Sequence, residues 1–251
     1  MKRNHDILSP TPEAISWRFR LRSDADTASD VTDELLGYLR TVLDAAEELY
    51  RPMEVDMPIS CFPPEVKPSD TFETVATKRL RTHLLSPSHQ DRFAVRADNP
   101  ITYGDLMALV EGFQCPNGTL PYIRMVKLLR GDTHIRLADG DHWISIDSDR
   151  YRAFEDGVPV DEPPSIDPIK IELHHRRGFS DRTESYYDLE IRSNTAIWLE
   201  ETEIGDENRK RLSRFLRSIY NLSGVESLET GTDDHRFSDD VVRELAIGPT
   251  E

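Results

Sequence analysis

Two short runs of alternating residues, followed by an amphipathic helix, constrain the fold of this chain more than any other stretch. Over residues 169–175 and again over 186–192, apolar and polar side chains alternate with the period of two that is typical of half-buried strands. The connection between the runs is polar and contains Gly178, so they predict an antiparallel hairpin. A helix and a further apolar run from Val225 complete a hairpin–helix–strand unit.

The helix of this unit has one apolar side and one basic side. Apolar residues recur with helical spacing between positions 212 and 220. Asp206 is expected to cap the first turn, and Gly224 is expected to end the helix. The opposite side has no acidic residue between positions 209 and 217. Its basic residues are Arg209, Lys210, Arg211, Arg214 and Arg217.

The amino-terminal part predicts a similar strand–helix–strand order. Residues 15–22 alternate between an apolar face and a basic face. Apolar spacing over about residues 30–50 predicts a helix, and Pro52 ends it before alternation resumes over 53–57. The basic face of the first strand is an arginine ridge made of Arg18, Arg20 and Arg22.

The central part predicts a short helix and a β-meander. Thr102, followed three residues later by Asp105, forms a capping-box pattern that opens the helix. Between positions 122 and 146, turn signals at 130–132 and 139–140 divide three apolar runs.

Together these segments predict an α+β protein with a mixed or mainly antiparallel sheet, two main amphipathic helices and a central β-meander. We expect a strand–helix–strand unit over residues 1–57 and a hairpin–helix–strand unit over 161–229. Residues 58–160 would hold a proline-rich loop, short helices and the meander, and 230–251 would be a mobile acidic tail. One elaborated domain is the alternative for a chain of 251 residues.

The composition is strongly acidic. Lys and Arg number 31 against 47 Asp and Glu, which gives a formal net charge of −16. A hydrophobic content of 37% with clear periodic segments argues against disorder. The composition favours a salt-in halophile, because the Debye length falls to roughly 3 Å at 1 M salt and makes an acidic surface tolerable. An ordinary acidic mesophilic protein is the alternative.

The two cysteines and the lack of a long apolar run bear on location. Cys61 and Cys115 are expected to be reduced thiols, with one long-range disulfide as the alternative. No apolar stretch is long enough for a signal peptide or a membrane span. We therefore expect a cytoplasmic protein with no membrane association.

Catalytic motifs are absent from the sequence, and basic surfaces are present. There is no Gly-x-Ser-x-Gly motif and no phosphate-binding glycine loop. The leading hypothesis is a non-catalytic interaction or assembly protein without a cofactor, which binds a protein partner or a second copy of itself. The arginine ridge and the helix side with Lys210, Arg214 and Arg217 would make the contact. Pairing with the chain's own acids and binding of nucleic acid are the alternatives.

A histidine and aspartate set supports a second hypothesis, a metal-dependent hydrolase or nuclease. Imidazole and carboxylate groups on adjacent strands suit a divalent metal, whose bound water would act as the nucleophile. The spacing matches no established metal signature, and acids around a turn are expected in so acidic a chain. The candidate ligands are His134, Asp141, His142 and His174.

Overall fold

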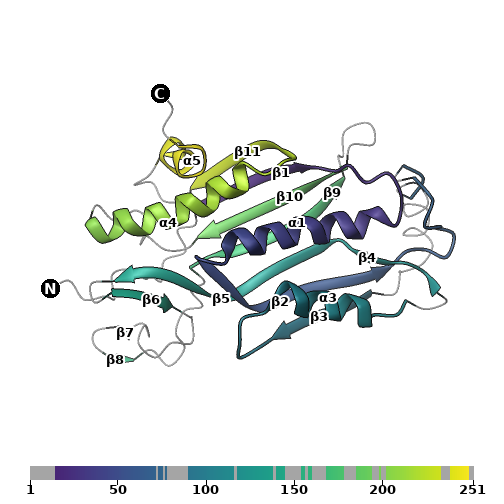
Figure 1. Ribbon diagram of the computed structural model, residues 1–251, viewed down its shortest axis with the longest axis horizontal. Coiled ribbons are helices and arrows are strands. Elements are labelled where there is room, and N and C mark those ends of the chain that lie inside the picture. The colour runs from purple at the N-terminus through teal and green to yellow at the C-terminus, as the bar shows by residue number, and fades with distance from the viewer. Residues whose placement is uncertain are drawn as a thin grey trace.

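A computed structural model describes most of the chain as one antiparallel sheet with helices packed on one of its faces (Figure 1). The described residues are 15–71, 73–75, 77, 90–115, 118–137, 140–144, 154–155, 158–159, 168–177, 185–193, 198, 202–232 and 238–248. Among them, no helix combines the length and the apolar composition that crossing a membrane requires.

The sheet confirms the α+β class and the antiparallel pairing expected from the sequence. Its strands follow the spatial order β11-β1-β10-β9-β5-β2-β3, with β4 paired to β2 and β6 paired to β5. Every described pair is antiparallel. In that order the strands are β11 (Val225–Thr232), β1 (Ile15–Arg22), β10 (Ser185–Ser193), β9 (Lys170–Arg177), β5 (Met125–Leu137), β2 (Tyr50–Cys61), β3 (Gln90–Arg96), β4 (Pro121–Ile123) and β6 (Gly140–Ile144). A separate ladder joins β7 (Phe154–Glu155) and β8 (Val158–Pro159).

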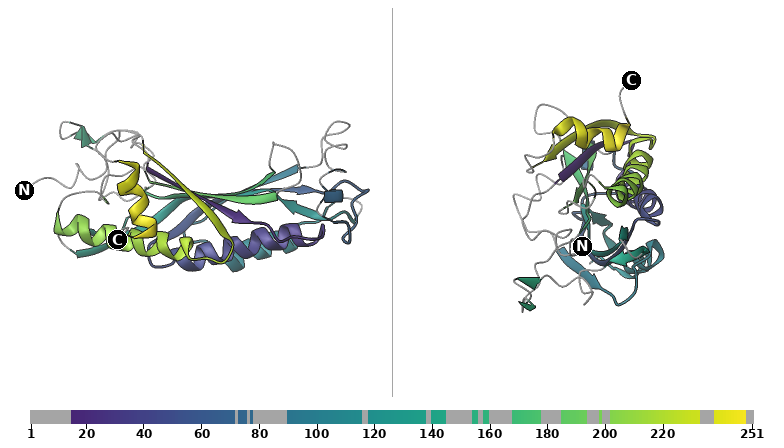
Figure 2. Two further views of the ribbon diagram at one scale, coloured as in Figure 1. Left: turned by 90° about the horizontal axis from the view of Figure 1, so that it is seen from above. Right: turned by 90° about the vertical axis from the view of Figure 1, so that its left-hand side faces the viewer.

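Helices α1 (Asp30–Ala46) and α4 (Glu203–Tyr220) lie end to end on the same face of the sheet, as the edge-on view in Figure 2 shows. Helix α3 (Tyr103–Gly112) contacts α1, and helix α5 (Asp239–Ile247) contacts α4. The sheet therefore has a helix-covered face and an opposite face, which we call the outer face.

Both strand–helix–strand units are crossovers between parallel strands of one sheet. Helix α1 connects β1 to β2 across three intervening strands, and α4 connects β10 to β11 across β1 alone. Because β1 and β10 are antiparallel and the two crossovers run in opposite directions over one face, both have the same hand. Strand β1 lies between β10 and β11, so the segments expected over 1–57 and 161–229 are interleaved in one sheet. The proposed boundaries stay predictions.

Helix α4 begins one turn earlier than the sequence pattern indicates. Thr202, not Asp206, is the cap, since its hydroxyl oxygen accepts a hydrogen bond of 3.0 Å from the Gly205 backbone N–H. Threonine has the same capping chemistry as aspartate, and the apolar spacing alone does not choose between them. Gly224 (φ 103°) forms the turn into β11, where a Cβ would lie 2.7 Å from the Tyr38 hydroxyl. The expected cap of α3 at Thr102 is present, and Ser238 caps α5.

The turn expected at residues 130–132 is wrong, and of the expected meander the described residues contain only the β5–β6 hairpin, because β4 pairs with β2 and not with β5. Strand β5 runs without interruption through this stretch because it pairs with β2. Arg130 takes a positive φ of 46°, and Gly131 lies against the Tyr50 ring. The glycine signal here reflects a close side-chain approach, not a chain reversal.

The main core lies between the sheet and the helices. The apolar face of β1, with Trp17, Phe19 and Leu21, is fully buried there. The Trp17 indole N–H donates a 2.8 Å hydrogen bond to the Val242 carbonyl of α5. Residues 225–232 form β11, and Val242 and Ala246 of α5 are buried in the core. Residues 230–232 of β11 and 239–247 of α5 are therefore packed elements of the fold, within the stretch expected to be a mobile acidic tail.

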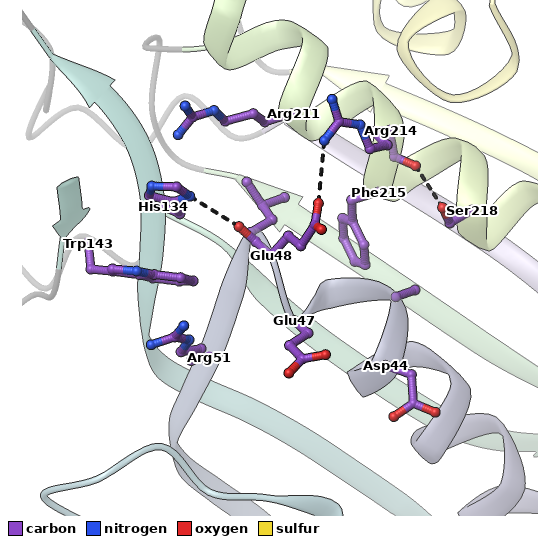
Figure 3. A pocket seen from close by; sticks show the side chains of 12 residues that line it. Asp44, Glu47, Glu48, Arg51, His134, Trp143, Arg211, Arg214, Phe215 and Ser218 are labelled. Atoms are coloured by element: carbon purple, nitrogen blue, oxygen red, sulfur yellow. Dashed lines mark hydrogen bonds and ion pairs between the residues drawn. The ribbon is translucent and has the colours of Figure 1, made fainter. Parts of the chain in front are cut away.

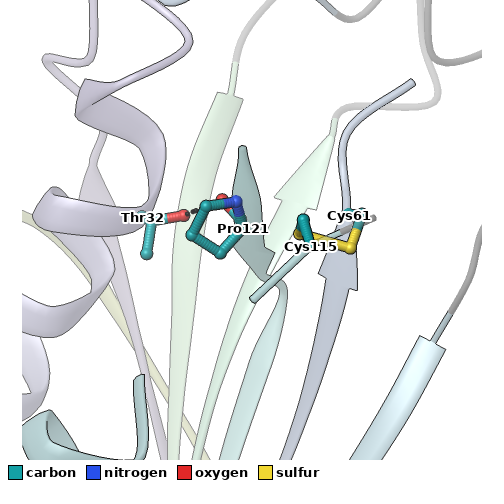
Figure 4. The surroundings of a disulfide bond; sticks show 4 residues. All are labelled: Thr32, Cys61, Cys115 and Pro121. Atoms are coloured by element: carbon teal, nitrogen blue, oxygen red, sulfur yellow. Dashed lines mark hydrogen bonds between the residues drawn. A yellow bond between two sulfur atoms is a disulfide. The ribbon is translucent and has the colours of Figure 1, made fainter. Parts of the chain in front are cut away.

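The expectation of two reduced thiols is wrong. Cys61, at the end of β2, and Cys115, beyond α3, form a disulfide with a Cα–Cα distance of 5.7 Å (Figure 4). Beside it, the Thr32 hydroxyl of α1 donates to the Pro121 carbonyl at 3.1 Å. The pairing of β2 with β4 and the position of α3 bring the cysteines together, and none of this can be read from their spacing.

Candidate functional site

Two hollows border the polar side of α4. The first, which we call the cavity, has a volume of about 840 Å³ and lies between the end of α1, α4 and the β5–β6 hairpin (Figure 3). The second, which we call the groove, has a volume of about 590 Å³ and follows α4 on its α5 side. Arg214 and Ser218 line both hollows.

The sheet side of the cavity is a stack of three side chains. His134 and Trp143 stand opposite each other in the β5–β6 register, and their rings stack with centroids 4.8 Å apart. The Arg51 guanidinium covers Trp143, 3.8 Å from the ring centroid. His134 Nδ1 lies 3.3 Å from the Glu48 carbonyl oxygen. Such contacts fix the side chains in place, which suits a preformed binding wall.

A carboxyl group next to this wall has a perturbed pKa. Asp132 stands opposite Arg51 in the β2–β5 register. Burial raises the pKa of Asp132, and the charge of Arg51 opposes that effect.

The helix side of the cavity carries two arginines with different environments. Arg211 donates a 2.6 Å hydrogen bond to Asp141, and this bond lowers the pKa of that carboxyl group. Arg214 lies 3.3 Å from the Glu48 carboxylate, but the two side chains are 71% and 83% exposed. The first guanidinium is held in place, whereas the second belongs to a loose surface pair worth less than about 1 kcal/mol.

The groove contains the basic residues of α4 that the sequence analysis selected. Lys210, Arg214 and Arg217 are all exposed there. Within the described residues, neither Lys210 nor Arg217 has a carboxylate within 4.0 Å. Arg217 Nη2 lies 3.3 Å from where a Cβ on Gly248 would be, next to the last turn of α5. Since α5 has no basic residue in its own last turn, Arg217 complements the negative end of that helix.

The arginine ridge lies on the outer face of the sheet, away from α4. Arg18 pairs with Asp188 at 3.6 Å and with Glu190 at 3.5 Å. Arg20 and Arg22 lie in ion pairs with Glu226 (3.3 Å) and Asp24 (2.7 Å). The ridge is thus neutralised by the chain's own acids. A single flat partner surface does not reach both the ridge and the helix.

These ion pairs belong to a wider charged network on the outer face. Asp188 also pairs with Arg176, and Glu190 pairs with Arg192. Both acids are only 9% exposed, and these ion pairs offset the cost of burying their charges. On neighbouring strands, hydrogen bonds from His174 and then Lys127, both at 3.0 Å, lower the pKa of Glu172 to about 2. Desolvation opposes this effect without overcoming it.

The four residues selected as metal ligands are not brought together. His134 and His142 lie on opposite faces of the β5–β6 hairpin, because they stand opposite Trp143 and Ile135. His174 pairs with Met125, nine residues along β5 from His134, which is about 30 Å of strand. Asp141 shares the side of His134 but is bonded to Arg211. Among the described residues, no group of three or more His, Cys, Asp or Glu could hold a metal ion.

Sequence reasoning missed most residues that line the cavity, among them Glu48, Arg51 and Trp143. Trp143 could have been placed, because a turn at 139–140 sets it opposite His134. Arg51 and Glu48 had no comparable signal, since they reach the cavity through the long-range pairing of β2 with β5.

Comparisons with protein-family models, with curated protein sequences and with solved structures found no match to this chain.

Proposed function

We propose that this protein is a non-catalytic interaction protein that binds an acidic segment of a partner protein along the groove of α4. Lys210, Arg214 and Arg217 are the residues that would contact it. The observation that carries the proposal is that Lys210 and Arg217 are exposed and, within the described residues, have no acid within 4.0 Å, in a chain with net charge −16.

Other exposed cations also have no carboxylate within 4.0 Å among the described residues, such as Lys67, Arg124 and Arg243. The argument therefore depends on Lys210 and Arg217 lying together along one groove. With 47 acidic against 31 basic residues, a basic side chain has many possible carboxylate partners in its own chain. The arginine ridge uses them, because Arg18, Arg20 and Arg22 all lie in ion pairs. Because no carboxylate pairs with Lys210 or Arg217 within the described residues, an acidic group of another molecule can pair with both.

The spacing of the three residues suits one elongated acidic segment. They occupy positions i, i+4 and i+7 of α4, which spans about 10 Å along one helical stripe. Close hydrogen-bonded contacts between guanidinium and carboxylate persist where long-range attraction is screened, so the interface would tolerate high salt. The halophilic interpretation of the acidic composition stays a prediction that fits this arrangement.

Nucleic acid is a poorer fit than an acidic protein. A chain of net charge −16 repels a polyphosphate backbone at long range. Asp206 also lines the groove, where it pairs with Arg209. A metal-dependent activity has less support still, because the candidate ligands lie apart.

The test is capture from an extract of the native host at its own salt concentration. The double variant Lys210→Glu/Arg217→Glu should lose the captured partner by at least tenfold, because it inverts the charge of the groove at two exposed sites. A matched control, Arg40→Glu/Lys67→Glu, makes the same charge change at exposed positions on α1 and in the loop after β2. Equal capture by both double variants and the parent protein would rule the groove out.

The cellular location belongs to the same proposal. The sequence favours the cytoplasm, whereas disulfides such as Cys61–Cys115 are typical of oxidising compartments. Fractionation of the host, with the partner followed in parallel, decides between them.

A further inference from the structure

We infer that the cavity beside α4 is a binding site for a small organic anion with an apolar body, and that the Glu48 carboxylate stands in the place of the ligand's headgroup. This inference concerns a ligand other than the protein partner. The two proposals share Arg214, but Lys210 and Arg217 belong to the groove alone and Arg211 and Glu48 to the cavity alone, so either proposal can fail without the other.

The cavity has the size and the floor that such a ligand needs. Its volume of about 840 Å³ lies within the range of roughly 300–1,000 Å³ common for small-molecule sites. Leu49 and Phe215 line it and are otherwise almost completely buried. These two side chains leave almost no accessible surface, so an aliphatic or aromatic body would lose contact with water mainly against the half-buried Trp143 and Ala45, which line the same cavity.

The headgroup position is set by two guanidinium groups and an imidazole. Arg211 and Arg214 lie three residues apart on α4, and His134 faces them from β5 (Figure 3). Arg211 is held by its 2.6 Å hydrogen bond to Asp141, so little side-chain entropy remains to be lost on binding. Planar guanidinium groups match the oxygen geometry of carboxylates and phosphates. Either headgroup therefore suits the position between Arg211, Arg214 and His134, which we call the corner of the cavity.

Glu48 already shows how a carboxylate contacts this corner. Its carboxylate lies 3.3 Å from Arg214 Nη1, and both side chains are mostly exposed. An exposed ion pair of this kind is weak, so an incoming anion that also gains apolar contacts can displace it. The chain thus carries its own weak competitor for the site.

The remaining acids of the cavity do not fill this corner. Asp44 lies 3.9 Å from Arg40 on α1. Glu47 and Asp44 point away from the two arginines in Figure 3. The negative charge is gathered on the α1 side, which favours an anion compact enough to stay on the α4 side.

The binding test uses phenyl phosphate and 3-phenylpropionate as probes, with neutral 3-phenylpropanol and inorganic phosphate as controls. Tryptophan fluorescence reports on the cavity, because Trp143 lines it while Trp17 and Trp198 are fully buried in the core. At least one of the two organic anions should give a saturable change, and both controls should bind at least tenfold more weakly. No saturable response to either organic anion would overturn the inference.

Three single variants test the roles of the residues. Arg211→Gln should weaken binding about tenfold or more, as expected for loss of a charged hydrogen bond. Glu48→Gln removes the competing carboxylate at an 83% exposed position and should tighten binding by up to about fivefold. Asp33→Asn, with the same charge change at the far end of α1, should leave binding unchanged.

If Asp33→Asn tightened binding of the probe as much as Glu48→Gln, the effect would be one of net charge alone. That result would overturn the assignment of Glu48. The groove variant Lys210→Glu/Arg217→Glu separates the two proposals. It should abolish partner capture and leave binding of the probe within about twofold.

Discussion

At the scale of single residues, Gly131 is a position where the fold leaves no room for a side chain. A Cβ at this position would lie 2.1 Å from Tyr50 Cε2 and 2.8 Å from the Arg51 carbonyl oxygen. Tyr50 is itself only 1% exposed, so its ring has little room to move. The pairing of β5 with β2 therefore depends on glycine, although a reader of the sequence would assign that glycine to a turn.

Gly131→Ala should lower the free energy of unfolding by about 2 kcal/mol, the usual scale of overpacking. Gly37, in the middle of α1, has no atom within 4 Å of an added Cβ and is the matched control. Gly37→Ala should raise the free energy of unfolding by roughly 0.5–1 kcal/mol, because alanine loses less backbone entropy in a helix. Denaturant unfolding of both variants measures this. Equal effects of the two changes would mean that the contact with Tyr50 is absent.

Glu172 makes the stability of the protein depend on acid pH. Its pKa is lowered from 4.5 to about 2 in the folded chain, chiefly by the hydrogen bond from His174. A lowered folded pKa contributes stability that is complete above the unfolded pKa and is lost as pH falls toward the folded pKa. That window runs from about pH 4.5 down to about pH 2.

Glu172→Gln should therefore destabilise the protein at neutral pH and flatten the decline of its stability across this window. The same substitution at Glu111, which is exposed on α3, is the control. Thermal unfolding between pH 2 and pH 7 gives the comparison. A pH profile that Glu172→Gln leaves as steep as that of the parent protein would contradict the assignment.

At the scale of elements, local signals predicted single strands and helices better than their ends. Alternation placed β1, β9 and β10 close to their observed bounds, and the capping-box pattern at Thr102 placed the start of α3. These signals depend on neighbours within a few residues. The start of α4 was misplaced by one turn because Thr202 and Asp206 have equivalent capping chemistry.

The link between β2 and the loop after α3 depends on the disulfide. Cys61 and Cys115 are 54 residues apart, and closing a loop of that length is worth about 4 kcal/mol in the chain-entropy description. Cys115→Ser should lower stability on that scale, and a reductant should lower the parent protein to the same level while leaving the variant unchanged. Alkylation of both cysteines in the unreduced, folded protein would contradict the bond.

At the scale of the whole molecule, the sequence predicted the fold class but not the order of the strands in the sheet. The position of β1 between β10 and β11 brings together segments about 170 and 200 residues apart, and nothing in either strand specifies the other. The same limit applies to function. The basic residues were evident, but only the sheet order places the arginine ridge on the outer face and Lys210 on the helix-covered side.

The histidines show the same limit, because residues that are neighbours in the sequence can lie on opposite faces of the sheet. His174 and His175 are neighbours in sequence, but strand alternation sends them to opposite faces. His174 joins the charged outer network, while His175 is buried between the Tyr122 hydroxyl (2.7 Å) and the Ser185 hydroxyl (2.6 Å). A cluster of histidines along a sequence is therefore not a cluster in space.

The central claim is that the groove side of α4 is covered by a partner in the cell. Amine labelling of lysines in the native host extract, compared with labelling of the purified protein, tests it directly. Lys210 should be several-fold less reactive in the extract, while the exposed Lys67 should react equally in both. Equal reactivity of Lys210 in the two samples would contradict the claim.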